Sequence, residues 1–402
     1  MIEFSETAVD HTPEAEAVRE EIDDICAEFD RDYWREKDRE GEYPHDFVDR
    51  LARDGWLGIL IPEEYGGKGL GTQEAVAMME TIAASGAGFS GAQTVHAAVY
   101  NSSPLVNYGS EEMKEDLLPR VAAGDAWIQC FSLTEEKAGS ESTAIETAAE
   151  KDGDEWVING EKIWTSRIDV SDYAVVAART TPYEEVEKKT QGVSLFLVEL
   201  EPAIDAGQIQ LSAIDKTVSG VVNSFEVEYD DLRIPEANLI GELDRGFYHV
   251  LDGLNEERLV IAAECAGLGE AAIERGAAYA ADREVFGNPI GKNQGVQHPL
   301  AAAYARVQAA RQLVYTAAAQ TGADADPKTV GAWANMAKYL ASEAAFEAAD
   351  AAVQTHGGRG VAREYDVERY FREARLTRLV PITQQLALNY VGENVLDLPR
   401  SF

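Results

Sequence analysis

The spacing of apolar residues divides the chain into a helical first part, a β-rich middle part and a long helical last part. In the first part Val18, Ile22, Ile25 and Phe29 recur at steps of three and four residues, which is typical of an amphipathic helix. Breaker residues crowd the stretch 61–69 and predict a loop there. Helical spacing predicts helices at residues 13–40, 46–54, 72–85, 92–108 and 110–122.

From about residue 129 to residue 236 the period of the pattern falls to two. Phe225, Val227 and Tyr229 alternate with acidic residues, which predicts a strand with one buried face. The apolar runs 173–179 and 193–200 predict two further strands. This part of the chain is therefore expected to form a compact β unit.

One dipeptide within the β unit favours a tight turn. Asn159-Gly160 lies between the segments Trp156-Val157-Ile158 and Lys162-Ile163-Trp164, and this pair is a strong signal for a two-residue β-hairpin. The polar stretch 181–191 predicts a solvated loop.

From about residue 242 the chain is rich in Ala and helical in pattern, with breaks near 287–289, 322–327 and 357–360. The whole order predicts a mainly α fold with a central β domain. We expect an N-terminal helical domain over 1–128, a middle β-barrel domain over 129–238 and a C-terminal four-helix bundle over 239–402. A chain of 402 residues is long enough for two or three packed units.

Composition narrows the classes of partner and compartment. A net charge of −37 argues against nucleic acid as a partner. Only 12 of the 35 basic residues are Lys, and acidic residues are spread along the whole chain, so we predict a halophilic protein adapted to a salt-rich cytoplasm. An ordinary acidic protein is the alternative. The chain contains no run of about 18 apolar residues, so we expect no membrane span. The acidic N-terminus does not have the pattern of a secretory signal.

Cysteine and histidine usage predicts no metal site. Cys26, Cys130 and Cys265 lie far apart and match no metal-ligand spacing, which favours reduced thiols in a cytoplasm. His96, on a predicted helix, is expected to serve packing or hydrogen bonding rather than ligation.

Two segments of the β unit carry candidate chemistry. The first, 130–140, ends in a small-residue turn in which Gly139 permits close backbone approach and the Ser140 hydroxyl can donate to a phosphate. The second, 157–166, places the aromatic face of Trp164 beside the hydroxyl of Ser166. Each feature alone is common in plain loops and cores. Together they suit a flat ring with polar edges and a diphosphate tail.

These two segments resemble the flavin-binding segments of the acyl-CoA dehydrogenase family. The first reads Thr-Glu-Pro-Gly-Ala-Gly-Ser-Asp in most of the family, and here Glu136-Lys137 and Glu141 depart from it. Segments at 57–67, 108–112 and 234–241 extend the resemblance, which runs from about residue 15 to 400. The resemblance implies FAD contacts from Phe131, Leu133, Thr134, Gly139, Ser140, Trp164 and Ser166, with Ser140 also near the substrate.

Two later segments, 283–294 and 354–358, resemble those that, in the family, reach the flavin of a neighbouring subunit. Their presence implies an oligomer, a homotetramer or a homodimer. The alternatives are a surface ion pair for Arg283 and a simple helix C-cap for Gly357-Gly358. The FAD contacts implied here are Arg283, Phe286 and Gln294 at the phosphate end and Gln354, Gly357 and Gly358 on the adenosine side.

The family needs a carboxylate base, and this chain lacks it at the commoner position. Most members carry the base near the C-terminus in Tyr-Glu-Gly-Thr, whereas here Pro381 occupies the Glu position. Thr383 and Gln385 remain as flavin contacts by resemblance. Proline also lacks the N–H that helps to bind the thioester carbonyl in the common arrangement. A flavin ribityl hydroxyl, with or without the amide of Ile382, would have to replace it.

Isovaleryl-CoA and long-chain acyl-CoA dehydrogenases place the base on the first long C-terminal helix, before an Arg. The aligned residue here is Glu257, followed by Arg258, and the resemblance implies substrate contacts from Asn255 and Arg258. An ion pair with Arg258 or with a partner-subunit Arg is the alternative role for Glu257, and Glu264, one heptad on, is a weaker candidate base. Periodicity independently places Glu257 on the apolar face formed by Val250, Leu254, Ile261, Cys265 and Leu268.

The resemblance implies an FAD-dependent oxidoreductase of fatty acid metabolism that converts an acyl-CoA to a trans-2-enoyl-CoA. An electron-transfer flavoprotein would accept the electrons. Two alternatives stay open: an oxidase or flavin monooxygenase on the same fold, and a non-catalytic flavin-binding subunit.

Overall fold

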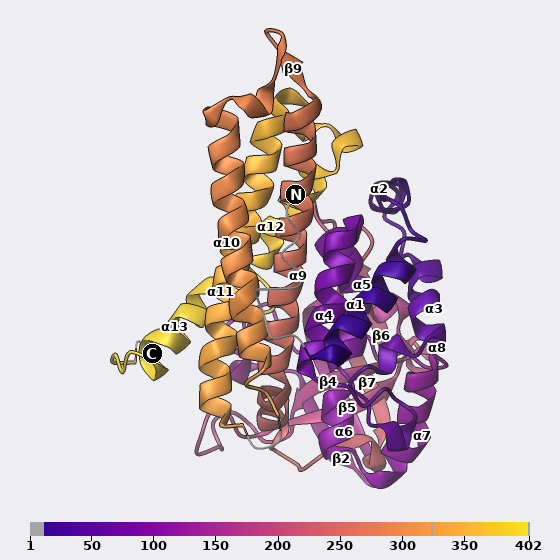
Figure 1. The fold of residues 1–402 in the computed structure, drawn as a ribbon. Helices are drawn as coiled ribbons and strands as arrows, with labels where there is room; N and C mark the ends of the chain where they lie inside the picture. The colour runs from indigo at the N-terminus through magenta and orange to yellow at the C-terminus, as the bar shows by residue number, and fades with distance from the viewer. Residues whose placement is uncertain (1–11, 323–324, 401–402) are drawn as a thin grey trace.

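The computed structural model describes residues 12–322 and 325–400, and it begins with a layer of helices (Figure 1). The stretch 13–40 forms two helices because Asp30 caps the second one, accepting from the Tyr33 N–H at 2.9 Å. The stretch 92–108 is also broken, where Pro104 enters the first turn of a new helix. The helices are α1 (Pro13–Cys26), α2 (Arg31–Glu40), α3 (His45–Arg53), α4 (Thr72–Ile82), α5 (Gly88–Tyr100), α6 (Ser103–Tyr108) and α7 (Glu111–Ala123).

The middle of the chain forms an eight-stranded sheet, as its period-two pattern predicts. The hydrogen-bonded order is β6-β7-β3-β2-β4-β5-β8, and β1 pairs in parallel with β4. A short helix, α8 (Leu200–Asp205), follows β5. The strands are β1 (Cys130–Ser132), β2 (Ala148–Asp152), β3 (Glu155–Ser166), β4 (Tyr173–Arg179), β5 (Val193–Glu199), β6 (Ile209–Ala213), β7 (Ser224–Pro235) and β8 (Leu239–Ile240).

The hairpin predicted at Asn159-Gly160 is wrong. Strand β3 runs straight through this dipeptide, and the tight turn lies earlier, between Asp152 and Glu155. Gly160 (φ +145°) instead coincides with a register shift in the pairing of β3 with β7. The Asn159 side chain accepts from the Asp231 N–H at 2.8 Å, so the polar residue stabilises a bulge rather than a turn.

The last part of the chain is a bundle in which three long helices pack beside the N-terminal layer (Figure 1). Alanines dominate its core, and the predicted breaks near 287–289, 322–327 and 357–360 separate its helices. A small β9–β10 hairpin (Glu284–Val285 and Asn288–Pro289) lies at one end. The helices are α9 (Gly246–Asp282), α10 (Gln294–Ala318), α11 (Pro327–His356), α12 (Val367–Thr377) and α13 (Gln384–Asn394).

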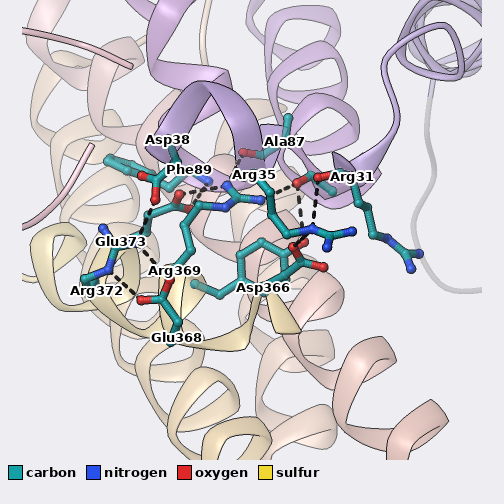
Figure 2. A network of polar contacts seen from close by, with 12 residues as sticks. Arg31, Arg35, Asp38, Ala87, Phe89, Asp366, Glu368, Arg369, Arg372 and Glu373 are labelled. Carbon is teal, nitrogen blue, oxygen red and sulfur yellow. Dashed lines mark hydrogen bonds and ion pairs between the residues drawn. The ribbon is translucent and has the colours of Figure 1, made fainter. Parts of the chain in front are cut away.

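A buried polar cluster fastens α12 to the junction of α4 and α5 (Figure 2). The Arg369 guanidinium donates to the carbonyls of Gly86 and Ala87, both at 2.7 Å, and to the Glu373 carboxylate at 2.9 Å. Glu373 in turn accepts from the Phe89 N–H at 2.8 Å. The start of α5 is therefore held by side chains from a helix almost 300 residues later in the chain.

The cysteines and the length and apolar content of the helices are two further features of the structure. All three cysteines are free and buried. Within residues 12–322 and 325–400, no helix has both the length and the apolar content needed to cross a bilayer.

Candidate functional site

The two segments with predicted flavin contacts lie side by side at one end of the sheet. The Ile163 N–H donates to the Thr134 carbonyl at 2.9 Å. The hydroxyls of Ser132 and Thr165 lie 3.3 Å apart. The structure thus brings the small-residue turn and the Trp-containing strand together, as the prediction requires.

The surface formed by these segments fits a flat aromatic ring. Trp164 is 55% exposed although it is large and apolar, and its backbone has a positive φ of +61°. The Ser166 hydroxyl lies next to it and within 2.8 Å of the Ser224 hydroxyl. Gly139 is exposed and has no atom within 4 Å of the place where a Cβ would stand, so a ligand can approach its backbone. Ser140 is likewise exposed, whereas Phe131, Leu133 and Thr134 are half-buried.

The buried Lys162 side chain holds the backbone of the small-residue turn. The Lys162 ammonium donates to the Leu133 carbonyl at 3.0 Å and to the Glu135 carboxylate at 2.8 Å. Burial lowers the pKa of Lys162 to about 8, although Glu135 opposes the shift. The Glu135 carboxylate also accepts from the Thr147 N–H at 2.9 Å. These contacts tie the small-residue turn to β3 and to the residue that precedes β2.

The FAD contacts predicted from the later segments lie elsewhere, at the end of the bundle that carries the β9–β10 hairpin (Figure 1). Tyr279 of α9 stacks on His356 of α11 at 4.1 Å, which brings the two helix ends together there. Phe286 is 99% exposed, with φ +54°. Exposed residues of this end include Arg283, Gln294, Gln354, Gly357 and Gly358.

The start of α13 and the residue that caps it carry the remaining predicted flavin contacts. Thr383 caps α13 by accepting from the Leu386 N–H at 3.4 Å, and Gln385 is exposed. The buried Lys338 ammonium holds this segment by donating to the Ile382 carbonyl at 2.7 Å.

Glu257 is a carboxylate on the packed face of α9. It is only 7% exposed, which agrees with its predicted place on the apolar face. Its Oε1 lies 4.0 Å from Nε2 of His96 on α5. Among the described residues its ion pair is with His96, and Arg258 instead donates to the Asn255 side chain at 2.8 Å. The alternative of an intramolecular Glu257–Arg258 ion pair is therefore not what the geometry shows.

A cavity of about 900 Å³ opens beside this part of α9. Asn255, Glu256 and Arg258 line it, so the lining surrounds the position of Glu257 without including it. The Arg258 Nε is buried and has no hydrogen-bond partner within the described part of the chain, and burial lowers the pKa of Arg258. A free buried donor of this kind suits a polar ligand group. The rest of the lining is Gly71, Thr72, Gln73, Glu74, Asn107, Tyr108, Tyr248, Leu251, Ala318, Thr321, Gly322, Ala325, Pro327, Lys328, Val330 and Tyr390.

Behind Glu257 lies a polar pair whose geometry the sequence did not reveal. Glu264 is fully buried, and its carboxylate lies 2.5 Å from Nδ1 of His96 and accepts from Gln93 at 2.7 Å. The hydrogen-bonding role expected for His96 is thus confirmed, with Glu264 as its partner. One signal could have found the pair: each helix carries an ionisable residue on a buried face, and such groups need partners.

Comparison with known proteins gives a consistent match along the chain. Three family models match, described as the acyl-CoA dehydrogenase N-terminal domain (residues 12–125), middle domain (130–230) and C-terminal domain (244–396). The acyl-CoA dehydrogenase fadE12 of Mycobacterium bovis is 34% identical over 399 residues, covering 99% of this chain and all of the relative. An acyl-CoA dehydrogenase of Bacillus subtilis is 34% identical over 88% of this chain and 90% of its own. The butyryl-CoA dehydrogenase structure from Megasphaera elsdenii superposes with a TM-score of 0.88 at 28% identity, covering 96% and 98% of the two chains.

Proposed function

Because the chain belongs to the acyl-CoA dehydrogenase family, an FAD-dependent family of oxidoreductases, we propose that it oxidises an acyl-CoA thioester to the trans-2-enoyl-CoA with Glu257 as the base. The observation that carries this proposal is a buried carboxylate, 7% exposed, on the apolar face of α9 beside a large cavity.

Glu257 has the surroundings that such a base needs. A carboxylate takes a proton from carbon more readily when it is shielded from water, because bulk solvent no longer stabilises its charged form. The thioester would lie in the cavity, where the unpaired Arg258 Nε and the Asn255 side chain can hold its polar part. In this position Glu257 would remove the α-proton.

The middle sheet has the groups needed to hold FAD. Trp164 offers an aromatic face, Ser166 a hydroxyl at the ring edge, and the turn at Gly139 and Ser140 an open backbone. When bound there, FAD supplies the acceptor for the β-hydride. An electron-transfer flavoprotein is the acceptor that we propose for the second half of the cycle.

A substitution at the base tests the reaction directly. Glu257→Gln should leave the protein yellow, because no predicted flavin contact changes, yet abolish most of the bleaching of the flavin by an acyl-CoA under anaerobic conditions. General-base removal typically costs about 10²–10⁴ in rate. Glu270→Gln is the matched control, since it changes a carboxylate on the same helix about 20 Å away.

Bleaching of Glu257→Gln at the wild-type rate would contradict the proposal. A wild-type protein that no acyl-CoA bleaches would favour a non-catalytic flavin-binding subunit.

We also propose that two copies of the chain complete each FAD site. Within one chain most of the predicted contacts fall into two groups, one around Trp164 on the sheet and one around Arg283 at the end of the bundle. Thr383 and Gln385 lie apart from both, at the start of α13. Phe286 is almost completely exposed in this second group, which suits a residue that a second copy covers.

Mixing two damaged variants tests this arrangement. Trp164→Ala and Arg283→Ala should each lose FAD affinity as pure proteins. When they are refolded together, two-fold heterodimers should regain one intact site each, or about a quarter of the wild-type FAD content. FAD content and subunit number are read from absorbance and light scattering. No recovery in heterodimers of proven composition would place each site within a single chain.

A further inference from the structure

His96 lies between two carboxylates of the same helix. Glu257 and Glu264 are seven residues apart on α9, and both point toward His96 on α5. The His96 Nδ1 lies 2.5 Å from Glu264, and its Nε2 lies 4.0 Å from Glu257. All three side chains are buried, with exposed fractions of 2%, 0% and 7% for His96, Glu264 and Glu257.

The contact with Glu264 fixes which nitrogen of the ring faces the base. A carboxylate accepts, so it holds the hydrogen on Nδ1, and Nε2 of the neutral ring is then left as an acceptor. The Tyr100 ring packs against the His96 ring at 4.7 Å and limits its rotation. Gln93 occupies the second oxygen of Glu264, which holds the carboxylate in place.

We propose that the His96–Glu264 pair is a positioning device that sets the orientation and protonation of Glu257 during catalysis. Protonated His96 donates Nε2–H to Glu257 and holds the base out of use. Neutral His96 leaves Glu257 free to act and then receives its proton. This inference rests on the proposed function of Glu257.

The proton transfers that accompany flavin reduction need no other reactant, and the imidazolium that they form must release its proton to solvent before the next turnover. The α-proton of the thioester passes to a Glu257 oxygen. The O–H bond of the resulting acid then breaks as an N–H bond forms on Nε2 of His96, which gives a carboxylate and an imidazolium paired with Glu264. Transfer needs about 2.6–3.2 Å or one bridging water, so the 4.0 Å gap must close by about 1 Å.

The charges around His96 favour its protonated form. Burial disfavours the imidazolium, but the carboxylates of Glu264 and Glu257 outweigh it and raise the pKa of His96. The Tyr100 phenol faces Glu257 from α5. Arg167, the cation on the sheet side, donates to the Gln93 and Gln129 carbonyls. Since the pKa is raised, the fraction of free Glu257 should grow as the pH rises through the titration of His96.

The test combines a kinetic readout with a structural one. Anaerobic single-turnover flavin reduction is followed from pH 5 to pH 10 with the acyl-CoA that reduces the wild type fastest. The titration of His96 is followed separately by NMR of protein with ¹³C-labelled histidine, in which His96→Asn identifies the signal. His96→Asn keeps a side-chain amide for Glu264 but cannot titrate. His45→Gln, an exposed histidine, is the control.

In the wild type the rate should rise in one step whose midpoint matches the NMR midpoint of His96. His96→Asn should lose this step and reduce the flavin about 10- to 100-fold more slowly at the plateau, as expected for a misplaced base. Glu264→Gln should move both midpoints at least one pH unit lower, because it removes the main charge that stabilises the imidazolium. This second variant also serves if His96→Asn does not fold.

The inference is overturned if His96→Asn or Glu264→Gln keeps the wild-type step, or if the two midpoints differ by more than about one unit. Glu257→Gln separates this outcome from failure of the proposed function. If an acyl-CoA still bleaches Glu257→Gln at the wild-type rate, the proposed role of Glu257 as the base is wrong. If it is inactive while His96→Asn keeps the wild-type step, only the role of His96 is wrong.

Discussion

Lys162 is a charged side chain that the middle sheet buries completely, beneath the surface proposed for the flavin ring. Removing it leaves the Glu135 carboxylate buried without its ammonium partner, which typically costs about 3–5 kcal/mol. Lys162→Met should therefore unfold at a much lower urea concentration than the wild type. Lys151→Met removes the exposed pair with Glu236 from the neighbouring strand and should change stability by less than about 1 kcal/mol. Equal effects of the two variants would contradict a special role for the buried pair.

The same lysine gives a signed pH dependence. Its pKa is lowered from 10.5 to about 8 in the folded protein, so between these values the unfolded chain holds one more proton than the folded one. Stability relative to Lys162→Met should therefore rise with pH across this window, by at most about 1.4 kcal/mol per pH unit. Urea titrations of both proteins at pH 7.5, 8.5 and 9.5 measure the slope. A difference that stays flat or shrinks would show that Lys162 keeps its ordinary pKa.

At the scale of an element, the packing of α12 onto α5 depends on the shape of one side chain. The Arg369 fork reaches two carbonyls and one carboxylate at once (Figure 2), and a lysine ammonium cannot span the same groups. Arg369→Lys should destabilise the fold by at least about 2 kcal/mol, since a buried carbonyl loses its donor. Faster hydrogen exchange at the Phe89 amide would locate the effect at the start of α5. Arg375→Lys, at an exposed position of α12, is the control.

The elements that the sequence predicted well are those whose pattern and context agree. The strand at Phe225–Tyr229 and the long α9 follow their periods of two and 3.6 residues. Asn159-Gly160 failed because pairing with β7 on one side and β2 on the other outweighs the local turn preference. The apolar face of α9 also located Glu257 correctly. Its distance from His96 could not be predicted, because it depends on how α5 docks on α9, and the start of α5 is itself held by Arg369 from far along the chain.

At the scale of the whole molecule, the excess of acidic groups should make stability depend on salt. The net charge is −37, so acidic groups far outnumber basic groups, and their mutual repulsion acts against the compact state. Raising KCl from 0.1 M to 1 M shortens the Debye length from about 10 Å to about 3 Å, which screens this repulsion. The same screening weakens exposed ion pairs such as Arg233–Asp152, but each of these contributes at most about 1 kcal/mol. We therefore expect the apparent Tm to rise by several degrees.

The way in which Tm increases with KCl concentration distinguishes screening from general salting-out. Screening saturates, so most of the gain in Tm should come below about 0.5 M KCl, whereas exclusion of salt from the surface grows steadily with concentration. Calorimetric scans at a fixed rate in KCl and in sucrose separate the two, because sucrose stabilises without screening charge. A Tm that is flat or falls over the low-salt range would contradict adaptation to high salt. The chain would then be an ordinary acidic protein, in which the surplus carboxylates lie so far apart that water alone keeps their repulsion small.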